Sequence, residues 1–231
     1  MTLSIIVPVY NEKNTILKIL KQVEEVDLPL EKEIIIVDDC STDGSRDVLK
    51  SLDRNKFKII FKEKNEGKGS ALKEGFMSAS GDIIIIQDAD LEYNPNDYKK
   101  VLEPILIGKA DVVYGSRILS GDAKRVLLIW HFLGNIFLTL LSDLFTGLTL
   151  TDMETGHKAF TKEVADSFKY KLKSKGFGIE PELTAQISRG KWRVYEVGIS
   201  YYGRTYAEGK KINWRDGLAA IWYIIKFNLF K

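Results

Sequence analysis

The chain has 231 residues, of which 45% are hydrophobic and 29% are charged, so it can bury a substantial core and is not a disordered segment. Its net charge of +2, the balance of 34 basic and 32 acidic residues, argues against a protein dedicated to nucleic-acid binding, which usually has a strongly basic face. The single cysteine, Cys40, excludes an intramolecular disulfide, and with only two histidines beside it a zinc site is not expected.

The first 117 residues alternate between apolar, β-branched runs and segments of helical character, without an internal repeat. The apolar runs predict strands at 3–10, 33–38, 57–62, 82–87 and 111–114. The segments between them predict helices at 14–26, 44–53, 68–79 and 95–107. Such alternation is typical of βαβ units, and continuous apolar runs indicate strands covered on both faces. The expected fold class is therefore α/β, with a Rossmann-like, mostly parallel sheet flanked by helices.

Polar clusters directly follow four of these predicted strands. They are "YNE" at 10–12, "DDCSTD" at 38–43, "DADLE" at 88–92 and "GSR" at 115–117. In open parallel sheets, ligands bind beyond the carboxyl ends of the strands. We therefore expect the four clusters to converge on one edge of the sheet and to form one site.

Three acids, Asp88, Asp90 and Glu92, follow the apolar run "IIII" of the fourth predicted strand. Residues two apart in an extended segment point the same way, so the three carboxylates would repel one another in a partly desolvated site. A hard divalent cation relieves that repulsion, and oxygen ligands suit Mg²⁺ or Mn²⁺. The alternative is a solvated turn in which Asp90 caps the helix that "NPND" at 94–97 begins.

Two further clusters permit either ligand binding or a purely local role. Asp39 and its neighbours can accept hydrogen bonds from a base or a ribose, whereas Asp43 or Ser45 can simply cap the next helix. The segment "NEGKGSALKEGF" at 65–76 places Lys68 and two glycines at a helix start, where backbone N–H groups favour a phosphate. It is neither a dinucleotide-binding nor a Walker motif, and a flexible helix entry is the simpler explanation.

Two apolar segments in the second half suggest a soluble domain that sits on a membrane. Residues 126–142 carry no formal charge but fall short of the roughly 20 apolar residues of a spanning helix, so we expect a buried or an interfacial helix. Lys124 and Arg125 precede them and suit an anionic surface. The end of the chain, "GLAAIWYIIKFNLFK", suits either the bilayer interface or packing on the domain. Because the N-terminus lacks the features of a signal peptide, we expect a cytoplasmic, peripheral location on the inner face of the membrane.

Several motifs resemble known enzymes. "SIIVPVYNE", "VDDCSTDGS", "NEGKGSAL" and "DADLE" resemble the inverting glycosyltransferases of family 2, which have the GT-A fold. "YGSR", "TDMETGHKAF" and "GFGIEPEL" resemble the branch of dolichol-phosphate mannose synthase and the polyprenyl-phosphate glycosyltransferases. The resemblance implies one GT-A domain over 1–231, with a nucleotide-sugar and metal half at 1–117. The acceptor half at 118–231 would contain interfacial helices near 124–146 and 215–230.

The resemblance also implies a role for individual residues. The nucleotide sugar would be bound by Pro8, Tyr10, Glu12, Asp39, Lys68, Asp88, Arg204 and Lys210, with Lys211 a nearby candidate. Mg²⁺ or Mn²⁺ would be held by Asp88, Asp90 and Glu92. The phosphate of a lipid acceptor would be bound by Arg117, His131, Asn135 and Lys158. The residues expected to matter most for catalysis are Asp90, Arg117 and Arg204. Relatives often have Gln in place of Glu92, and Arg and Ser in place of His131 and Asn135, so the acceptor site departs most from the pattern of the family.

The expected reaction moves a hexose from a UDP- or GDP-linked sugar to a polyprenyl or dolichyl phosphate, with inversion, in the synthesis of cell-envelope glycans. A phosphate acceptor is largely ionised at pH 7 and needs no base. The alternative is a family 2 transferase acting on a sugar hydroxyl, which would need Glu180 or Glu182 as a general base. A binding module without turnover is a further alternative. A homo-oligomer or a separate membrane subunit is compatible with the resemblance.

Overall fold

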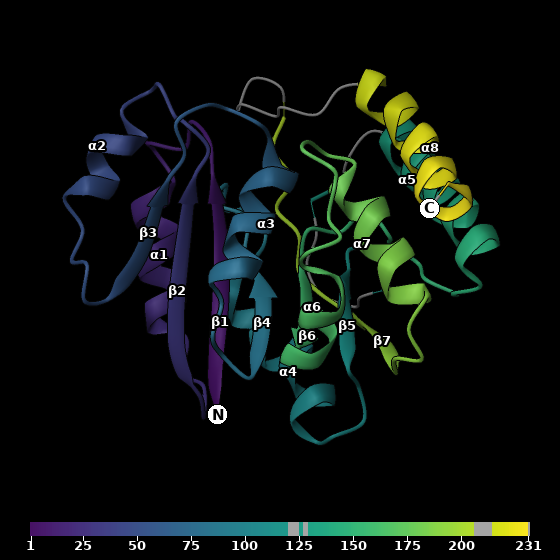
Figure 1. The fold of residues 1–231 in the computed structure, drawn as a ribbon, viewed down its shortest axis with the longest axis horizontal. Helices are drawn as coiled ribbons and strands as arrows, with labels where there is room; N and C mark the ends of the chain where they lie inside the picture. The colour runs from purple at the N-terminus through teal and green to yellow at the C-terminus, as the bar shows by residue number, and fades with distance from the viewer. Residues whose placement is uncertain (120–124, 127–128, 206–213, 231) are drawn as a thin grey trace.

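Seven strands of the described residues form one sheet between two layers of helices (Figure 1). The computed structural model describes residues 1–119, 125–126, 129–205 and 214–230. The strands are β1 (Thr2–Val9), β2 (Glu31–Asp38), β3 (Phe57–Phe61), β4 (Ile83–Ile86), β5 (Val112–Ser116), β6 (Lys158–Thr161) and β7 (Val194–Gly198). Their order is β3-β2-β1-β4-β6-β5-β7, and β6 is antiparallel to both neighbours while the other pairs are parallel. The mostly parallel α/β sheet expected from the sequence is confirmed.

Helices cover both faces because each inner strand is apolar on both sides. The helices are α1 (Ile16–Glu25), α2 (Ser45–Lys50), α3 (Lys68–Ser78), α4 (Tyr98–Leu106) with a preceding 3₁₀ turn η1 (Pro95–Asp97), α5 (Ile129–Thr146), α6 (Lys162–Phe168), α7 (Ile179–Ser188) and α8 (Trp214–Leu229). In β1, Ile5 and Val7 pack in the cluster that includes α1 and α4, whereas Ile6 packs in the cluster that includes α3, α6 and α7. In α1, the buried residues recur at helical spacing and give one apolar face: Ile16, Ile19, Leu20 and Val23.

The antiparallel strand β6 was not predicted, and it separates β5 from β4. It has only four residues, within a motif that carries more polar than apolar positions. Because β6 runs against its neighbours, the segment 151–157 that precedes it lies at the carboxyl edge of β4 and β5. The inserted strand therefore brings the segment 151–157, from the second half of the chain, to the edge of the sheet where the first-half clusters lie.

Helix α5 packs on the protein through small polar residues together with Leu138 and Leu141, and it turns most of its large apolar side chains toward the exterior. Its buried residues are Thr139 and Ser142, and the following large apolar side chains are exposed: Ile129, Trp130, Phe132, Leu133, Phe137, Leu140, Leu144 and Phe145. By length and composition α5 could cross a membrane, and only 11% of it is buried, unlike the core helix of a soluble protein. Burial in the core, one of the two expectations for this segment, is therefore wrong.

Helix α8 lies beside α5 at one end of the sheet and also packs on α7 (Figure 1). Its side chains Ile224 and Phe227 are buried, whereas Leu218, Trp222 and Leu229 are exposed. Helix α8 therefore both packs on the domain and has an apolar outer surface. We call the surface formed by the exposed apolar residues of α5 and α8 the apolar end.

Candidate active site

The loops after β1 and β2 are joined by a set of short hydrogen bonds. The Ser41 hydroxyl accepts from the backbone N–H of Asn11 at 3.0 Å, and the Ser45 hydroxyl accepts from that of Glu12 at 2.9 Å. The Asp43 carboxylate accepts from the backbone N–H of Lys13 at 3.0 Å. These contacts confirm that the first two polar clusters converge, and they give Asp43 and Ser45 a local role in holding the loops together.

Asp39 holds the segment that leads into α3. Its carboxylate accepts from the backbone N–H of Gly67 at 2.6 Å and from that of Glu66 at 3.1 Å, and it pairs with Lys62 at 2.6 Å. Gly67 has a φ of +94°, a left-handed backbone that favours glycine. Asp39 is almost completely buried, so its contacts in this structure are with the protein. Its predicted part in nucleoside binding stays a prediction.

The first residue of α3, Lys68, lies between two acids from distant parts of the chain. Its Nζ is 2.8 Å from Asp88 Oδ1 and 3.2 Å from Glu180 Oε1. Burial disfavours its charge, but the two carboxylates outweigh burial and raise the pKa of Lys68 above its ordinary value. A permanent cation therefore stands at the carboxyl edge of the sheet, beside the end of β4.

Arg204 is a second cation at this edge, and it gathers acids from two other loops. Its Nη2 is 3.1 Å from Glu12 Oε1 and 3.1 Å from Asp90 Oδ2. Its backbone N–H donates to Glu92 Oε1 at 2.6 Å. Burial disfavours the charge, but Asp90 and Glu12 raise the pKa of Arg204. Residues separated by 192 positions along the chain, Glu12 and Arg204, thus lie in direct contact.

The three acids predicted to share one face do not form a preformed metal cluster. Residues 87–92 turn instead of continuing as a strand, and Leu91 has a φ of +66°. Asp88 therefore pairs with Lys68, whereas Asp90 and Glu92 contact Arg204. Among the described residues, no three acidic, histidine or cysteine side chains are placed to hold a metal ion.

The donor atoms and the charge at this turn nevertheless fit a divalent cation. Burial, followed by the charges of Asp88 and Glu92, raises the pKa of Asp90 to about 7. Burial and, after it, repulsion between the carboxylates outweigh the opposite effect of Arg204 on this pKa. Mg²⁺ commonly binds to one or two carboxylates and completes its shell with water and substrate phosphates, so a cluster of three is not required.

Arg117, at the end of β5, is fixed by a bidentate ion pair. Its Nε and Nη2 each donate to Asp152 at 2.6 Å. Burial alone would raise the pKa of Asp152, but Arg117 lowers it below its ordinary range. Asn135 of α5 donates to Asp152 at 2.9 Å, and His131 lies one turn earlier on α5, half-buried. The structure thus brings three predicted acceptor residues, Arg117, Asn135 and His131, to one side of the site.

The remaining predicted acceptor residue, Lys158, is fully buried in β6. Its Nζ donates to the backbone carbonyls of Met153 and Thr155 and to the carboxylate of Glu180. It also lies 5.0 Å from the centre of the Tyr114 ring. In this structure its ammonium group is surrounded by protein atoms, and its predicted contact with a phosphate stays a prediction.

Glu180 and Glu182, the carboxylates considered as a general base, both have structural partners. Glu180 joins Lys158 to Lys68. Glu182 accepts from the backbone N–H groups of Lys173 at 2.8 Å and Ser174 at 2.7 Å, and it is fully buried.

Three other residues were predicted to bind the nucleotide sugar, and the structure describes two of them. Pro8 lies in β1, paired with Val37, and the exposed Tyr10 follows the strand end directly. Lys210, like Lys211, lies outside the described residues.

Sequence reasoning missed three residues that hold Arg117 and the segment 151–152 in place. Asp152 fixes Arg117, and its place within the motif at 151–160 was the available signal. Glu196 of β7 accepts from the backbone N–H groups of Thr151 and Asp152 at 3.0 and 3.1 Å. Tyr201 contacts both Arg117 and Glu92. No local pattern marks Glu196 or Tyr201, because their partners lie far away in the sequence.

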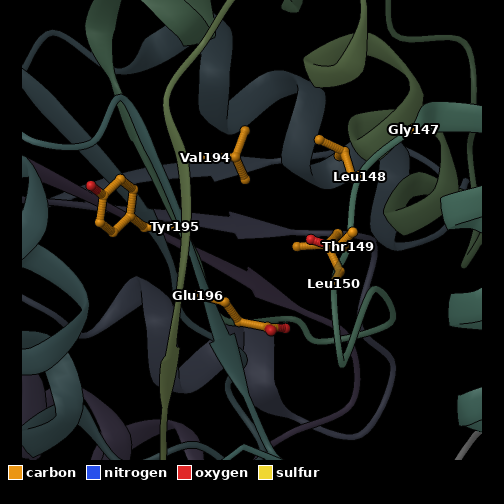
Figure 2. Close-up of a pocket in the computed structure, with 7 residues that line it drawn as sticks. All are labelled: Gly147, Leu148, Thr149, Leu150, Val194, Tyr195 and Glu196. Atoms are coloured by element: carbon orange, nitrogen blue, oxygen red, sulfur yellow. The ribbon is translucent and has the colours of Figure 1, made fainter.

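A cavity of about 400 Å³ lies between β7 and the segment 147–150, and its lining includes Glu196 but none of Lys68, Arg117 and Arg204 (Figure 2). Glu196 extends from β7 toward that segment, whereas Tyr195 points to the other side of the strand (Figure 2). Because the carboxylate of Glu196 is already bonded to backbone N–H groups, we place the site where the charged loops converge and not at this cavity.

The chain matches the model of the family described as glycosyl transferase family 2 over residues 4–168. It is similar to a dolichol-phosphate mannosyltransferase of Pyrococcus furiosus, with 31% identity over 92% of this chain, and it spans 61% of that relative's length. It is also similar to a UDP-N-acetylglucosamine–dolichyl-phosphate N-acetylglucosaminyltransferase of Methanococcus voltae, with 26% identity over 98% of this chain and 96% of the relative.

Among solved structures, the chain is similar to glucosyl-3-phosphoglycerate synthase from Mycobacterium tuberculosis in complex with Mn²⁺, UDP and phosphoglyceric acid. The TM-score is 0.75 at 20% identity, covering 100% of this chain and 79% of that one. At this identity the likeness concerns the fold, which is the GT-A-like arrangement expected from the sequence.

Proposed function

Because the chain belongs to glycosyl transferase family 2, and is therefore a glycosyltransferase, we propose that its acceptor is a polyprenyl or dolichyl phosphate. We further propose that the donor is a UDP- or GDP-linked hexose and that transfer occurs at the cytoplasmic face of a membrane. Relatives named for transfer to dolichyl phosphate support this choice of acceptor. The observation that carries it is α5, which contacts the Arg117 pair through Asn135 and is apolar on its outer side.

The donor diphosphate is proposed to bind where Lys68 and Arg204 stand. Both cations lie at the carboxyl ends of the strands, the position at which open α/β sheets bind ligands. Each is now held by carboxylates, so an arriving diphosphate exchanges protein partners for phosphate oxygens. As the bond from the sugar to the diphosphate breaks, negative charge grows on the leaving group, and Arg204 and Lys68 stabilise that charge.

Asp88, Asp90 and Glu92 would hold Mg²⁺ or Mn²⁺, which would act as a Lewis acid toward the leaving diphosphate. The carboxylates themselves have a second part in the site. They hold Lys68 and Arg204 at the edge of the sheet before the donor binds, so the cations are already in place. This arrangement reduces the reorganisation that the reaction requires.

The acceptor phosphate is proposed to bind beside Arg117, with Asn135 and His131 of α5 next to it. Asp152 fixes the plane of the guanidinium, which orients it for a planar, charge-assisted contact with phosphate oxygens. A phosphate monoester with a second pKa near 6 is already a nucleophile at pH 7. The structural partners of Glu180 and Glu182 support a reaction that uses neither as a base.

The apolar end is proposed to lie on the membrane surface. Trp130, Phe137 and Leu144 of α5 and Trp222 of α8 are all more than half exposed. Exposed apolar surface of this extent on adjacent helices, including Trp, is typical of a membrane-interface contact. The polar side of the same helix α5 faces Arg117 and Asp152, so the bound surface and the site share one element.

The proposal is tested with purified protein, a panel of UDP- and GDP-linked sugars, Mg²⁺ or Mn²⁺, and a polyprenyl phosphate in mixed micelles. We expect one donor to give both free nucleoside diphosphate and a lipid-linked sugar, and Asp90→Ala to abolish both products. Near-normal turnover of Asp90→Ala, or of the unmodified protein in excess chelator, would exclude the metal from the reaction.

The hydroxyl-acceptor alternative makes the opposite prediction for two variants. If a sugar hydroxyl were the acceptor, Glu180→Gln would stop turnover and Arg117→Ala would be tolerated. Transfer to a lipid phosphate predicts that Arg117→Ala raises the KM for the lipid by at least about tenfold, the effect of losing one charge-assisted contact.

A further inference from the structure

Tyr201 contacts residues on both sides of the site. Its hydroxyl donates to Glu92 Oε2 at 2.9 Å, on the donor side. The centre of its ring lies 5.2 Å from the guanidinium carbon of Arg117, on the acceptor side. This distance is within the range of a cation–π contact.

The contacts with Glu92 are divided between its two carboxylate oxygens. Oε1 accepts from the backbone N–H of Arg204, and Oε2 accepts from Tyr201. The backbone carbonyl of Glu92 accepts from the N–H of Tyr202 at 2.9 Å. Burial raises the pKa of Tyr201 well above its ordinary value, so the phenol stays protonated and can donate to Glu92 at any physiological pH.

The guanidinium of Arg117 is held along its edge and over its face. Asp152 accepts two hydrogen bonds from its edge, and the Tyr201 ring covers its face. An ion pair along one edge leaves a guanidinium able to tilt about that edge. A ring over the face restricts this tilt, because the contact is favourable only when the cation lies above the ring.

Tyr201 is itself held firmly. It forms an isolated antiparallel bridge with Tyr93, and the two rings are 5.4 Å apart. Its backbone carbonyl accepts from the N–H of Arg125 at 2.9 Å. Tyr93 in turn accepts a hydrogen bond from Gly156 and stacks on the buried His157. The ring of Tyr201 is itself buried and is therefore one end of an aromatic cluster that is anchored in the core.

We propose that Tyr201 is a positioning residue that fixes Glu92 on the donor side and Arg117 on the acceptor side in one arrangement. Its hydroxyl positions Glu92, on the donor side, and its ring positions Arg117, on the acceptor side. The two functions can therefore be removed by different substitutions. This inference rests on the proposed function for its assay, but its contacts with Glu92 and Arg117 can also be tested without an acceptor.

The test compares Tyr201→Phe, which keeps the ring, with Tyr201→Leu, which removes both functions. For Tyr201→Phe we expect the KM for the donor to rise about tenfold, the effect of losing a hydrogen bond to a charged group, and the KM for the lipid to change by less than about twofold. For Tyr201→Leu we expect the same rise for the donor and a rise of about tenfold for the lipid. Tyr195→Phe is the matched control, because Tyr195 lies on β7 and is exposed, and we expect unchanged constants.

A second readout follows Arg117 directly. In protein labelled with ¹⁵N-arginine, the Nε–Hε signal of Arg117 is identified by its absence in Arg117→Lys. The ring current of Tyr201 should displace this signal, so we expect its position to be retained in Tyr201→Phe and lost in Tyr201→Leu. A purely structural role would lower the thermal stability of both variants and leave the KM values and this pattern unchanged.

The proposal is overturned if Tyr201→Phe raises both KM values equally, or if Tyr201→Leu spares the lipid KM. Failure of the proposed function is a separate result, namely that the unmodified protein transfers no sugar to polyprenyl phosphate. In that case the Tyr201 proposal is decided by calorimetric titration with UDP and GDP in the presence of Mn²⁺ and by the Arg117 signal. If neither nucleotide binds the unmodified protein, the Arg117 signal alone decides, and an unchanged signal in Tyr201→Leu overturns the proposal.

Discussion

Gly156 lies directly against the ion pair between Asp88 and Lys68, so a single methyl group there should disturb the proposed donor site. A Cβ at Gly156 would be 2.4 Å from Asp88 Oδ2 and 3.0 Å from Lys68 Nζ. Ordinary contacts begin at 3.4 Å, so the carboxylate must retreat by about 1 Å. A displacement of about 1 Å in a positioned catalytic group costs about 100-fold in rate. We therefore expect Gly156→Ala to lower kcat/KM by about 100-fold.

The variant should nevertheless remain folded, so that its loss of turnover can be measured. Overpacking of one methyl group costs about 1–3 kcal/mol, and in a chain of this size each kcal/mol lowers Tm by about 2–4 °C. Sugar transfer is measured with saturating lipid, and Tm is measured by calorimetry on the same preparation. The control is Gly217→Ala, because a Cβ there meets nothing within 4 Å, and we expect wild-type activity from it.

A double mutant shows whether the methyl group acts through Asp88. If it does, Gly156→Ala adds no further loss to Asp88→Ala, because the two changes affect the same contact. A folded Gly156→Ala variant with wild-type kcat/KM would refute the reasoning. Equal and independent losses in the double mutant would show that Gly156 acts elsewhere.

Three further predictions concern stability and membrane binding. Lys158→Met leaves the buried carboxylate of Glu180 with fewer cationic partners, so we expect the free energy of unfolding in urea to fall by about 3–5 kcal/mol; a loss below about 1 kcal/mol would contradict this. Burial lowers the pKa of His157 to about 4, below its unfolded value near 6.5, so the unfolded chain binds a proton at this residue before the folded chain does. The free energy of unfolding should therefore be highest above pH 6.5 and should fall as the pH is lowered toward 4. In His157→Phe, the slope of the unfolding free energy against pH between pH 4 and 6.5 should fall by about 1.4 kcal/mol per pH unit. Identical pH profiles for the variant and the unmodified protein in denaturant unfolding would contradict this prediction. Trp130 and Leu144 are exposed, so the double variant Trp130→Ser, Leu144→Ser should bind anionic vesicles at least tenfold more weakly in a sedimentation assay, with an unchanged free energy of unfolding. Undiminished binding would show that α5 is not part of the membrane contact.

The sequence predicted those elements whose apolar pattern is strong over several residues. The five strands and four helices of the first 117 residues are close to their predicted bounds, because β-branched runs and helical spacing are local signals. β6 and β7 were missed because each mixes polar and apolar residues, whereas the equally short β4 is a run of four isoleucines. Their place in the sheet is decided by pairing with distant strands, which no local pattern records.

The site was predictable in its composition but not in its internal contacts. Strand ends and the rule for parallel sheets placed Glu12, Asp88 and Asp90 at one edge. The turn after β4 was the alternative to a row of three carboxylates, and it is what the structure shows, although Asn94 and not Asp90 caps the following 3₁₀ turn. The three carboxylates are shared between Lys68 and Arg204. Which cation meets which acid depends on loops that approach from both halves of the chain.

The width of α5 sets the distance between the proposed membrane surface and Arg117, and so the distance that the phosphate of a lipid acceptor would have to travel. A helix with its side chains is about 10–12 Å across, and Arg117 meets α5 on the side opposite its apolar residues. The headgroup layer of one leaflet is about 5–8 Å deep. Drawing an isoprenoid tail into water costs about 0.8 kcal/mol for every CH₂ exposed. If the apolar end lies in the headgroup layer, as proposed, Arg117 would stand only a few Å above the bilayer surface. Most of the tail of a lipid acceptor could then stay in the hydrocarbon, and affinity for that acceptor would depend little on the length of its chain.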